Sequence, residues 1–396
     1  MEISQYVEKM KKVYEEFHSF IENEDDEQSN FETLKKVIKD NIKSDDADGI
    51  QSFLNIIIKY SDNHHRNIGF FDKIEQILIF LKNDIKTNFS NQSVFHIFKS
   101  NKRILLILIE HDILIIDESI SKIMSTNEFK EQKYDLFFSP ELKPFLKENL
   151  NFEVTEDFYS KRKEGENDSH LCELIRKDDI KEFIIYSNQI NLHLGSNVIE
   201  SIFETNHLLL KNKDTKIIEY ATFFGSIEIV KYLMANGVEL ESSLMIYCIH
   251  SNNEEMINFL VSIHKIDPPK GKYETCFKES IKCHHNQIAQ YFENNFLEPN
   301  KTRTVNEIIH YQCIEENESY KYGESEVSYG IKYNNYLFIP SNLIDDKFSF
   351  FYLCESNNKK LVKLYLQTNQ FDLKTSLIHQ SLFLLESSFC ISSNSK

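Results

Sequence analysis

Apolar side chains recur every three or four residues along the first part of the chain. Between residues 2 and 22 they stand at Ile3, Tyr6, Val7, Met10, Val13, Tyr14, Phe17 and Phe20. This spacing places them on one face of an α-helix. The same amphipathic pattern returns over residues 31–42, 50–60 and 70–81, and polar stretches interrupt it at 22–27, 45–49 and 61–63. The pattern predicts an N-terminal helical array over residues 1–90, with the acidic stretch 22–27 as a solvated loop.

A helix–turn–helix unit stands out over residues 221–238, ATFFGSIEIVKYLMANGV. A short helix begins near the small residue Ala221 and ends at Gly225, and a second helix over 227–235 ends before Gly237. Both glycines can take the positive φ that a tight turn and a helix C-terminus require. The positions expected in the core of the second helix are Ile229, Val230 and Leu233.

The same unit can be followed along the chain by the residue that takes the place of Gly225. The corresponding residues are Ser100 in 96–110, Asp178 in 174–186, Asn252 in 248–260, His284 in 280–292 and Asn357 in 353–366. Asn and Asp tolerate left-handed backbone, whereas Ser and His tolerate it less well. The positions 178, 225, 252 and 284 are 47, 27 and 32 residues apart. The pattern resembles an irregular ankyrin repeat, whose period is about 33 residues.

These units set the expected organisation. An ankyrin-like repeat domain is expected over residues 91–298, with its best units at 171–192, 219–240, 246–267 and 277–298. Residues 299–348 show no clean repeat and are expected to form an irregular insertion, in which the Tyr-rich segment 320–336 could be hairpin-like. A C-terminal ankyrin-like unit follows at 349–386, and a frayed tail at 387–396. The predicted fold class is all-α, an alpha solenoid of degenerate ankyrin-type helix–turn–helix repeats with an N-terminal helical array.

Five segments carry a more specific resemblance. They are KRKEGENDS at 161–169, followed by Cys172 and LIRKDD at 174–179, ESIFETN at 200–206, IEYATFFGS at 218–226, IHS at 249–251 and IKCHHN at 281–286. Together they resemble a large protist family of ankyrin repeat proteins that share an ankyrin-like domain of unknown function, over roughly residues 130–373. The resemblance implies a protein-interaction scaffold and brings no catalytic residues.

Composition narrows the classes of function. The 396 residues include only 9 Gly and 6 Pro, which favours helices, and no phosphate-binding Gly-rich loop is present. The net charge of −17 disfavours nucleic acid and anionic lipid as partners. Seven dispersed cysteines suit reduced thiols, and the N-terminus lacks a secretory signal. The longest apolar run, 104–109, is too short to span a bilayer. We expect a cytoplasmic protein, with the nucleus as the alternative, that is neither secreted nor in the membrane.

Four clusters of reactive side chains were weighed. Cys283, His284 and His285, with Cys276 and His264, are the best metal candidate, but their spacing is wrong for a zinc finger and a structural role is favoured. The run 64–66 (HHR) is expected to be a solvated loop. The run 161–163 (KRK) is expected to be a solvated helix end, with a patch for phosphate or an acidic partner as the sharper alternative. Cys248 and His250, two residues apart on a helix, face different directions, so Cys248 is assigned to the core.

The sequence therefore predicts a non-catalytic scaffold or adaptor that binds other proteins through the concave face and the turn tips. The tips of the two best units supply the candidate binding residues Lys213, Asp214, Thr215, Glu239, Glu241 and Ser242. The acidic surface suggests a partner with a basic surface. No cofactor, metal or catalytic residue is assigned. The alternatives are a regulatory factor acting in the nucleus or on nucleic acid, and an enzyme, which would need a pocket with converging titratable groups.

Overall fold

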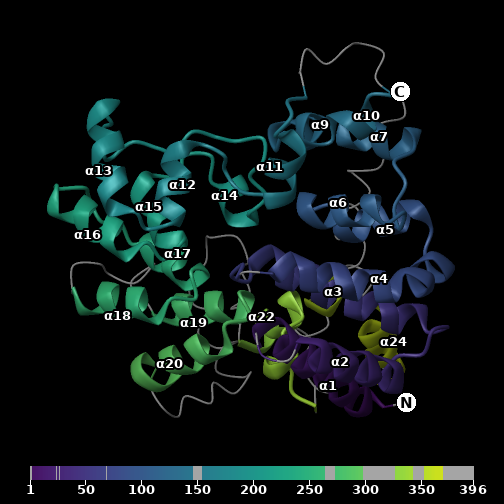
Figure 1. Ribbon diagram of the computed structural model, residues 1–396. Helices are drawn as coiled ribbons and strands as arrows, with labels where there is room; N and C mark the ends of the chain where they lie inside the picture. The colour runs from purple at the N-terminus through teal and green to yellow at the C-terminus, as the bar shows by residue number, and fades with distance from the viewer. Residues whose placement is uncertain are drawn as a thin grey trace, which may run out of the picture.

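The computed structural model describes residues 2–23, 25, 27–67, 69–145, 154–263, 273–297, 326–341 and 352–368. Within these residues the regular structure is helical, and the one β-type contact is an isolated bridge between Asn197 and Lys216. The helices form two groups that lie side by side, one coloured purple to blue and the other teal to green (Figure 1). The prediction of an all-α fold is confirmed for this part of the chain.

The first group contains the N-terminal helices. These are α1 (Ile3–Glu22), α2 (Glu27–Asn41), α3 (Ala47–Asn63), α4 (Phe70–Asn88), α5 (Asn91–Phe98), α6 (Lys102–Glu110), α7 (Glu118–Met124), α8 (Asn127–Glu131), α9 (Tyr134–Phe137) and α10 (Ser139–Leu142). All eight apolar residues expected on one face of α1 are buried, so that prediction is confirmed. Of the acidic stretch 22–27, Glu22 ends α1 and is partly buried, and Glu27 begins α2. The expected solvated loop is therefore seen only at the exposed Asn23 and Asp25.

The second group is a succession of helix pairs. After α11 (Phe158–Glu164) come the pairs α12 (His170–Arg176) and α13 (Ile180–Gln189), α15 (Ile217–Phe223) and α16 (Ile227–Ala235), α17 (Leu244–His250) and α18 (Glu254–Ser262), and α19 (Tyr273–Lys282) and α20 (Asn286–Phe296), with the short α14 (His207–Lys211) before α15. The first helices contact one another in chain order, α12 with α15, α15 with α17, and α17 with α19. Each pair therefore packs on its neighbour.

The turns within these pairs share one backbone geometry. The φ angle is positive at Asp178 (48°), Gly225 (70°), Asn252 (52°), His284 (60°) and Asn357 (56°), which are five of the six positions aligned from the sequence. In four of these turns the next residue donates its N–H to the carbonyl five residues before it: Asp179 to Leu174, Ser226 to Ala221, His285 to Ser280 and Asn358 to Leu353. This is the Schellman end of an α-helix. At the sixth position, Ser100, φ is not positive, and Asn101 instead caps α6 by accepting from the Ile104 N–H at 3.1 Å.

The unit around Gly225 matches the prediction in its second helix, 227–235, whereas its first helix begins at Ile217, four residues before the predicted start near Ala221. Gly237 has a φ of 80°. The four apolar positions assigned to its core, Ala221, Ile229, Val230 and Leu233, are fully buried.

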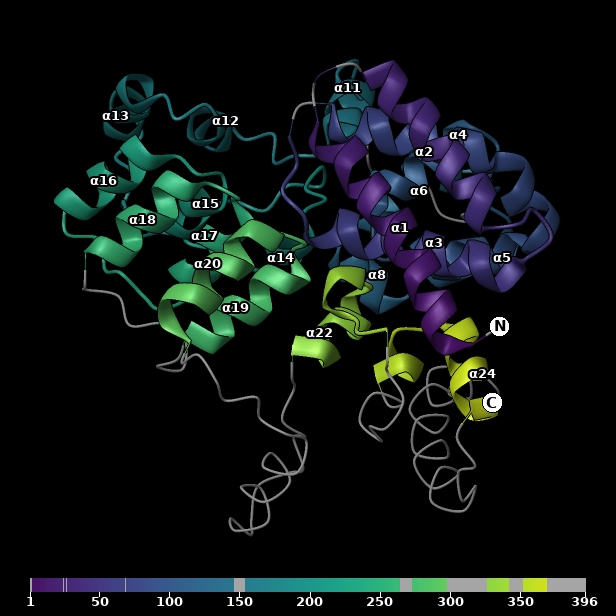
Figure 2. The same cartoon turned by 90° about the horizontal axis from the view of Figure 1, so that it is seen from below.

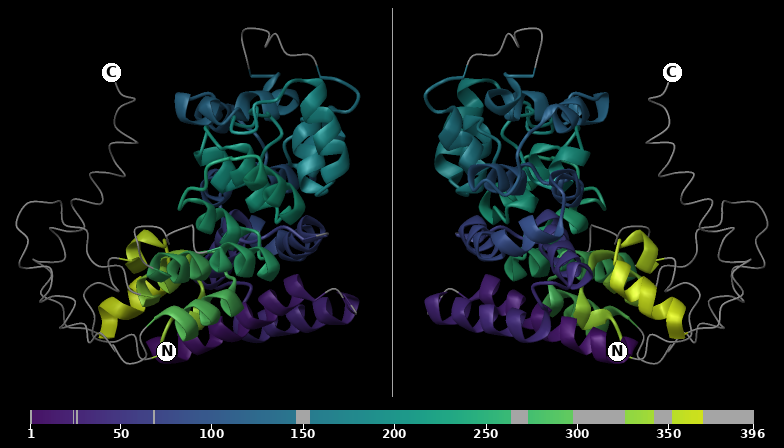
Figure 3. Two further views of the ribbon diagram at one scale, coloured as in Figure 1. Left: turned by 90° about the vertical axis from the view of Figure 1, so that its left-hand side faces the viewer. Right: turned by 90° about the vertical axis from the view of Figure 1, so that its right-hand side faces the viewer.

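The hydrophobic core divides in a different place from the expected boundary at residue 90. One buried cluster joins apolar residues of 3–142 with those of 331–365, and a second joins residues of 171–292. The helices of residues 91–142 therefore share the core of the N-terminal array. The C-terminal unit does so too, because α24 (Lys359–Thr368) contacts α1 and α3 (Figure 3).

Part of the expected insertion forms helical structure that bridges the two groups. Helix α22 (Glu326–Tyr333) contacts α19 on one side and α3 on the other, and the 3-10 turn η2 (Tyr336–Phe338) contacts α1 (Figure 2). The described residues of the Tyr-rich segment thus form a helix and a turn in place of the hairpin considered from sequence. Residues 299–325 and 342–348 of the insertion, residues 349–351 and 369–386 of the expected C-terminal unit, and the tail at 387–396 lie outside the described residues.

Candidate binding cleft between the two groups of helices

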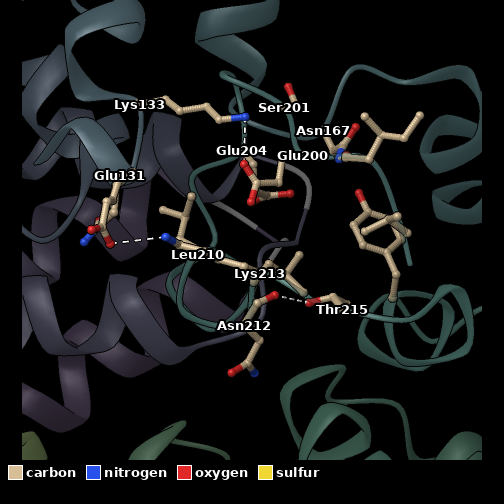
Figure 4. Close-up of a pocket in the computed structure, with 15 residues that line it drawn as sticks. Glu131, Lys133, Asn167, Glu200, Ser201, Glu204, Leu210, Asn212, Lys213 and Thr215 are labelled. Carbon is tan, nitrogen blue, oxygen red and sulfur yellow. Dashed lines mark hydrogen bonds and ion pairs between the residues drawn. The ribbon is translucent and has the colours of Figure 1, made fainter. Parts of the chain in front are cut away.

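A cleft lies where the two groups of helices meet. Residues 131–133, at the end of α8, form one wall. The other wall comes from the second group: Asn167, residues 198–201, Glu204, the end of α14 with the loop after it, and Tyr220 of α15 (Figure 4). The lining mixes carboxylates and amines with the apolar side chains of Val198, Ile199, Leu209 and Leu210.

Two ion pairs cross the mouth of the cleft. Lys133 Nζ lies 2.8 Å from Glu200 Oε2, and Lys213 Nζ lies 3.1 Å from Glu131 Oε2 (Figure 4). The side chains of Glu200, Lys213 and Glu131 are about half exposed or more, and that of Lys133 is 28% exposed, so each pair contributes about 1 kcal/mol or less. Each of these four charged side chains has its partner within the two pairs. None of the four pairs with the carboxylate of Glu204.

Glu204 lines the cleft with a side chain that is only 6% exposed. Its Oε1 accepts two bonds from Asn206, from the backbone N–H at 2.7 Å and from Nδ2 at 2.8 Å. Its Oε2 is buried and has no hydrogen-bond partner. A buried polar atom without a partner costs about 1–3 kcal/mol, and more when the group is charged. This oxygen is therefore an unsatisfied acceptor that would gain from a hydrogen-bond donor.

A second carboxylate, Glu166, lies behind Glu204. Asn206 Nδ2 also donates to Glu166 Oε2 at 2.6 Å, and Arg66 Nη1 approaches Glu166 Oε1 at 3.4 Å. Burial and the neighbouring charge of Glu204 raise the pKa of Glu166 to about 7, against the opposing effect of Arg66 and Arg176. Glu166 does not line the cleft. The two carboxylates therefore do not face one space, as a general acid and base acting on one substrate would need to.

The loop that carries Glu204 is fixed by close backbone contacts. Thr205 donates from both its N–H (3.1 Å) and its hydroxyl (2.7 Å) to the carbonyl of Gly165. Gly165 ends α11 with a φ of 75°, and a Cβ at this position would lie 2.9 Å from the Thr205 hydroxyl. Arg66 adds bonds to the Thr205 hydroxyl at 2.8 Å and carbonyl at 2.9 Å. A rigid backbone of this kind holds the Glu204 carboxylate in place.

The structure places two of the six predicted turn-tip residues in the lining of the cleft and four outside it. Five of them are exposed: Lys213, Asp214, Glu239, Glu241 and Ser242. The tips of the two units adjoin, because Lys216 pairs with Glu241. Thr215 differs from the expectation, since it is 2% exposed and its hydroxyl donates to the Asn212 carbonyl at 2.6 Å. Lys213 and Thr215 line the cleft.

Sequence reasoning missed Glu204 and Ile199. Ile199 is 78% exposed at the cleft, and its carbonyl accepts from Asn167 Nδ2 at 2.6 Å. In the sequence, the segment 200–206 carries a family resemblance but no sign of a binding site. An isolated isoleucine and glutamate between helices give no periodic signal, so only the folded loop shows that they share a cleft.

The prediction of a solvated loop at 64–66 is wrong. His64 is 7% exposed, and its ring contacts Glu22 Oε1 (2.6 Å) and the Cys283 carbonyl (2.8 Å). The side chain of Arg66 is also largely buried, against Glu166. This segment lies between α3 and α4 and contacts the second group of helices. Polar atoms of that group form hydrogen bonds with it that water would otherwise form.

The solvated helix end predicted at 161–163 is also only partly correct. Helix α11 does end there, at Glu164, and Lys163 is exposed. Arg162, in contrast, is 3% exposed, and its Nη1 bonds Glu141 at 2.8 Å and the Phe137 carbonyl at 3.2 Å. The guanidinium thus joins α11 to the end of the N-terminal array.

The histidines of the metal candidate lie at the contact between the helix groups. His284 Nδ1 is 3.0 Å from the Tyr14 hydroxyl, and His285 Nδ1 is 2.8 Å from the Ile249 carbonyl. Burial, with the neighbouring charge of His64, lowers the pKa of both rings well below the usual value. Both rings serve packing contacts, and His264 lies outside the described residues.

Cys283 lies close to two residues, His250 and Glu279, that the sequence had not grouped with it as metal ligands. The ligand atoms of His250, Glu279 and Cys283 lie within 4.8 Å of one another. Glu279 Oε1, however, already contacts His250 Nε2 at 2.8 Å and Lys282 Nζ at 2.6 Å. The lysine ammonium takes the position beside the carboxylate that a cation would need, so we assign this cluster as a buried ion pair. Cys248 is fully buried in the second core, as predicted.

Comparisons of the chain with models of known protein families, with curated proteins and with solved structures found no match. Among the described residues, none of the helices has the length and apolar character needed to cross a membrane.

Proposed function

We propose that this chain is a non-catalytic protein-binding scaffold, an alpha solenoid of degenerate ankyrin-type helix–turn–helix units whose binding site includes the cleft at Glu204. Two features support the ankyrin-type assignment. The Schellman turn recurs at four aligned positions, and the first helices of successive pairs stack in chain order. A solenoid of this kind presents its turn tips on one edge, and such tips are common binding surfaces.

The scaffold acts in the cytoplasm, with the nucleus as the alternative, because the described cysteines are free thiols.

One observation carries the location of the site. The cleft combines an apolar rim, Ile199 at 78% exposure, with the partnerless buried oxygen of Glu204. Exposed apolar side chains are usually unremarkable when scattered, but here one borders a concave, charged space. A partner that covers Ile199 and supplies a donor to Glu204 would remove both unfavourable features at once.

The experiment is site-specific photo-crosslinking in the native cell. A photoreactive phenylalanine analogue replaces Ile199 in one version of the full chain and Ile79 in the other. Ile79 is a matched control because it is also an exposed isoleucine, on α4 of the N-terminal array. We expect a discrete protein adduct at 199 and not at 79. The partner recovered from the adduct should bind the purified chain and lose affinity for Ile199→Asp. Equal adducts at both positions, or none at 199, would overturn the proposed site.

A further inference from the structure

We propose that the cleft receives a lysine side chain of the partner protein, whose ammonium donates to the free Oε2 of Glu204. The inference rests on the proposed protein-binding function and names the chemistry of the partner. It starts from the one oxygen in the cleft lining that is buried without a partner. A ligand for this position must donate a hydrogen bond, and a cationic donor also neutralises the carboxylate.

None of the remaining charges around the cleft pairs with this oxygen. At the mouth, Lys133 is held by Glu200 and Lys213 by Glu131. Deeper in the structure, Lys102 feels the charge of Glu204, but its Nζ donates to the Ile202 carbonyl at 3.4 Å and lies over the rings of Tyr134 and Phe137. Burial lowers the pKa of Lys102 to about 7, which weakens it further as a counter-ion. The chain's net charge of −17 attracts a basic segment to the surface as a whole.

The geometry favours lysine over arginine. Oε1 of Glu204 already accepts both N–H groups of Asn206, so only Oε2 is available. Arginine recognises a carboxylate best through two parallel hydrogen bonds, which need both oxygens. Lysine is a point charge that needs only one. Its four-carbon stem can also pack on the apolar lining at Val198 and Leu210 while the ammonium reaches the carboxylate.

The test is a selection of randomised displayed peptides on the purified full-length chain. The same library is selected against Glu204→Gln, and against Glu200→Gln as a matched control in the same cleft whose carboxylate is already paired. We expect lysine at one fixed position in peptides selected by the wild-type chain and by Glu200→Gln, and loss of that preference with Glu204→Gln. Replacing that lysine by norleucine, which keeps the stem and removes the ammonium, should weaken binding to the wild-type chain by about tenfold to a hundredfold.

The outcomes separate this inference from the proposed function. Cleft-binding peptides with no basic position, or norleucine peptides that bind as tightly as the lysine peptides, overturn the lysine assignment and leave the scaffold standing. A selection that yields no peptide sensitive to Ile199→Asp counts against the binding site itself. If circular dichroism shows that Glu204→Gln does not fold, the norleucine comparison on the wild-type chain decides the question alone.

Discussion

Mild acid should destabilise this protein through the partly buried His18 and His65. Burial, with a further contribution from the charge of His64, lowers the pKa of both His18 and His65 from 6.5 to about 4. In the unfolded chain these rings take up protons near pH 6.5, whereas in the folded chain they do so only near pH 4. Unfolded protein therefore binds more protons in this window, so stability is full above pH 6.5 and falls as the pH drops toward 4.

The size of the effect follows from these shifts. At pH 5 each ring is about 1.5 units below its unfolded pKa, and one unit corresponds to about 1.4 kcal/mol, so each contributes a loss of about 2 kcal/mol. The two rings give about 4 kcal/mol, and residual solvent contact reduces this to about 2–4 kcal/mol. His284 and His285, whose pKa values burial lowers further, act in the same direction. Domains are stable by only about 5–15 kcal/mol, so the loss should be easily measured.

Glu22 acts in a separate pH window. Hydrogen bonding and the charge of His64 hold the pKa of Glu22 at about 2 despite its burial. A carboxyl with a lowered pKa loses its contribution only as the pH falls below its unfolded value of about 4.5. Glu166, whose pKa is raised to about 7 by burial and the charge of Glu204, takes up its proton in the folded chain between pH 7 and 5 and therefore opposes the loss. The difference between the wild type and a histidine variant, rather than the total change, reports the contribution of one ring.

The assay is urea unfolding followed by circular dichroism at pH 7, 6 and 5. We expect the wild-type chain to lose at least about 2 kcal/mol between pH 7 and 5, and His65→Gln to lose about 1–2 kcal/mol less, since it removes one titrating ring. His193→Gln, at an exposed position, should lose as much as the wild type. Stability that does not change over this pH range, or a His65→Gln variant with the full loss, would refute the reasoning.

Two further predictions concern the repeat units. Gly225→Ala should lower the free energy of unfolding by about 1–2 kcal/mol, because alanine is strained at a φ of 70° and its Cβ would lie 2.9 Å from Asn253 Nδ2. Gly237→Ala has a similar φ of 80° but open space around the new Cβ, so it should lower the free energy of unfolding by less. An equal loss for the two variants in thermal unfolding would contradict the role of the Asn253 contact. Glu279→Gln should destabilise the chain by about 3–5 kcal/mol in urea unfolding, because it leaves the largely buried ammonium of Lys282 without its carboxylate, and an unchanged midpoint would contradict a buried ion pair.

Local signals in the sequence were sufficient for the helices and for most turns of the repeat units. The spacing of Ile3 to Phe20 reports directly which face of α1 is buried, because one helical turn spans about 3.6 residues. Gly225 takes positive φ because it has no Cβ, and Asp178 and Asn252 do so because their short polar side chains tolerate it. This preference is a property of each residue alone. Histidine tolerates positive φ less well, so His284 needs a further reason. It takes the same φ because Ile281 and Ser280 provide the helix-ending bonds and Tyr14 binds its ring.

Only the tertiary structure decided which polar residues are buried. His64 and Arg66 follow a polar turn and look solvated, yet the second group of helices covers them. The division of the core is also non-local, since α24 packs on α1 and α3 from the far end of the chain. The cleft has the same origin: Glu131 and Lys213 come within 3.1 Å although 82 residues separate them in sequence. The sequence by itself thus determined the helices and their repeating turns, because these depend on residues a few positions apart. The burial of charge and the cleft depend on contacts between distant segments, which no local pattern encodes.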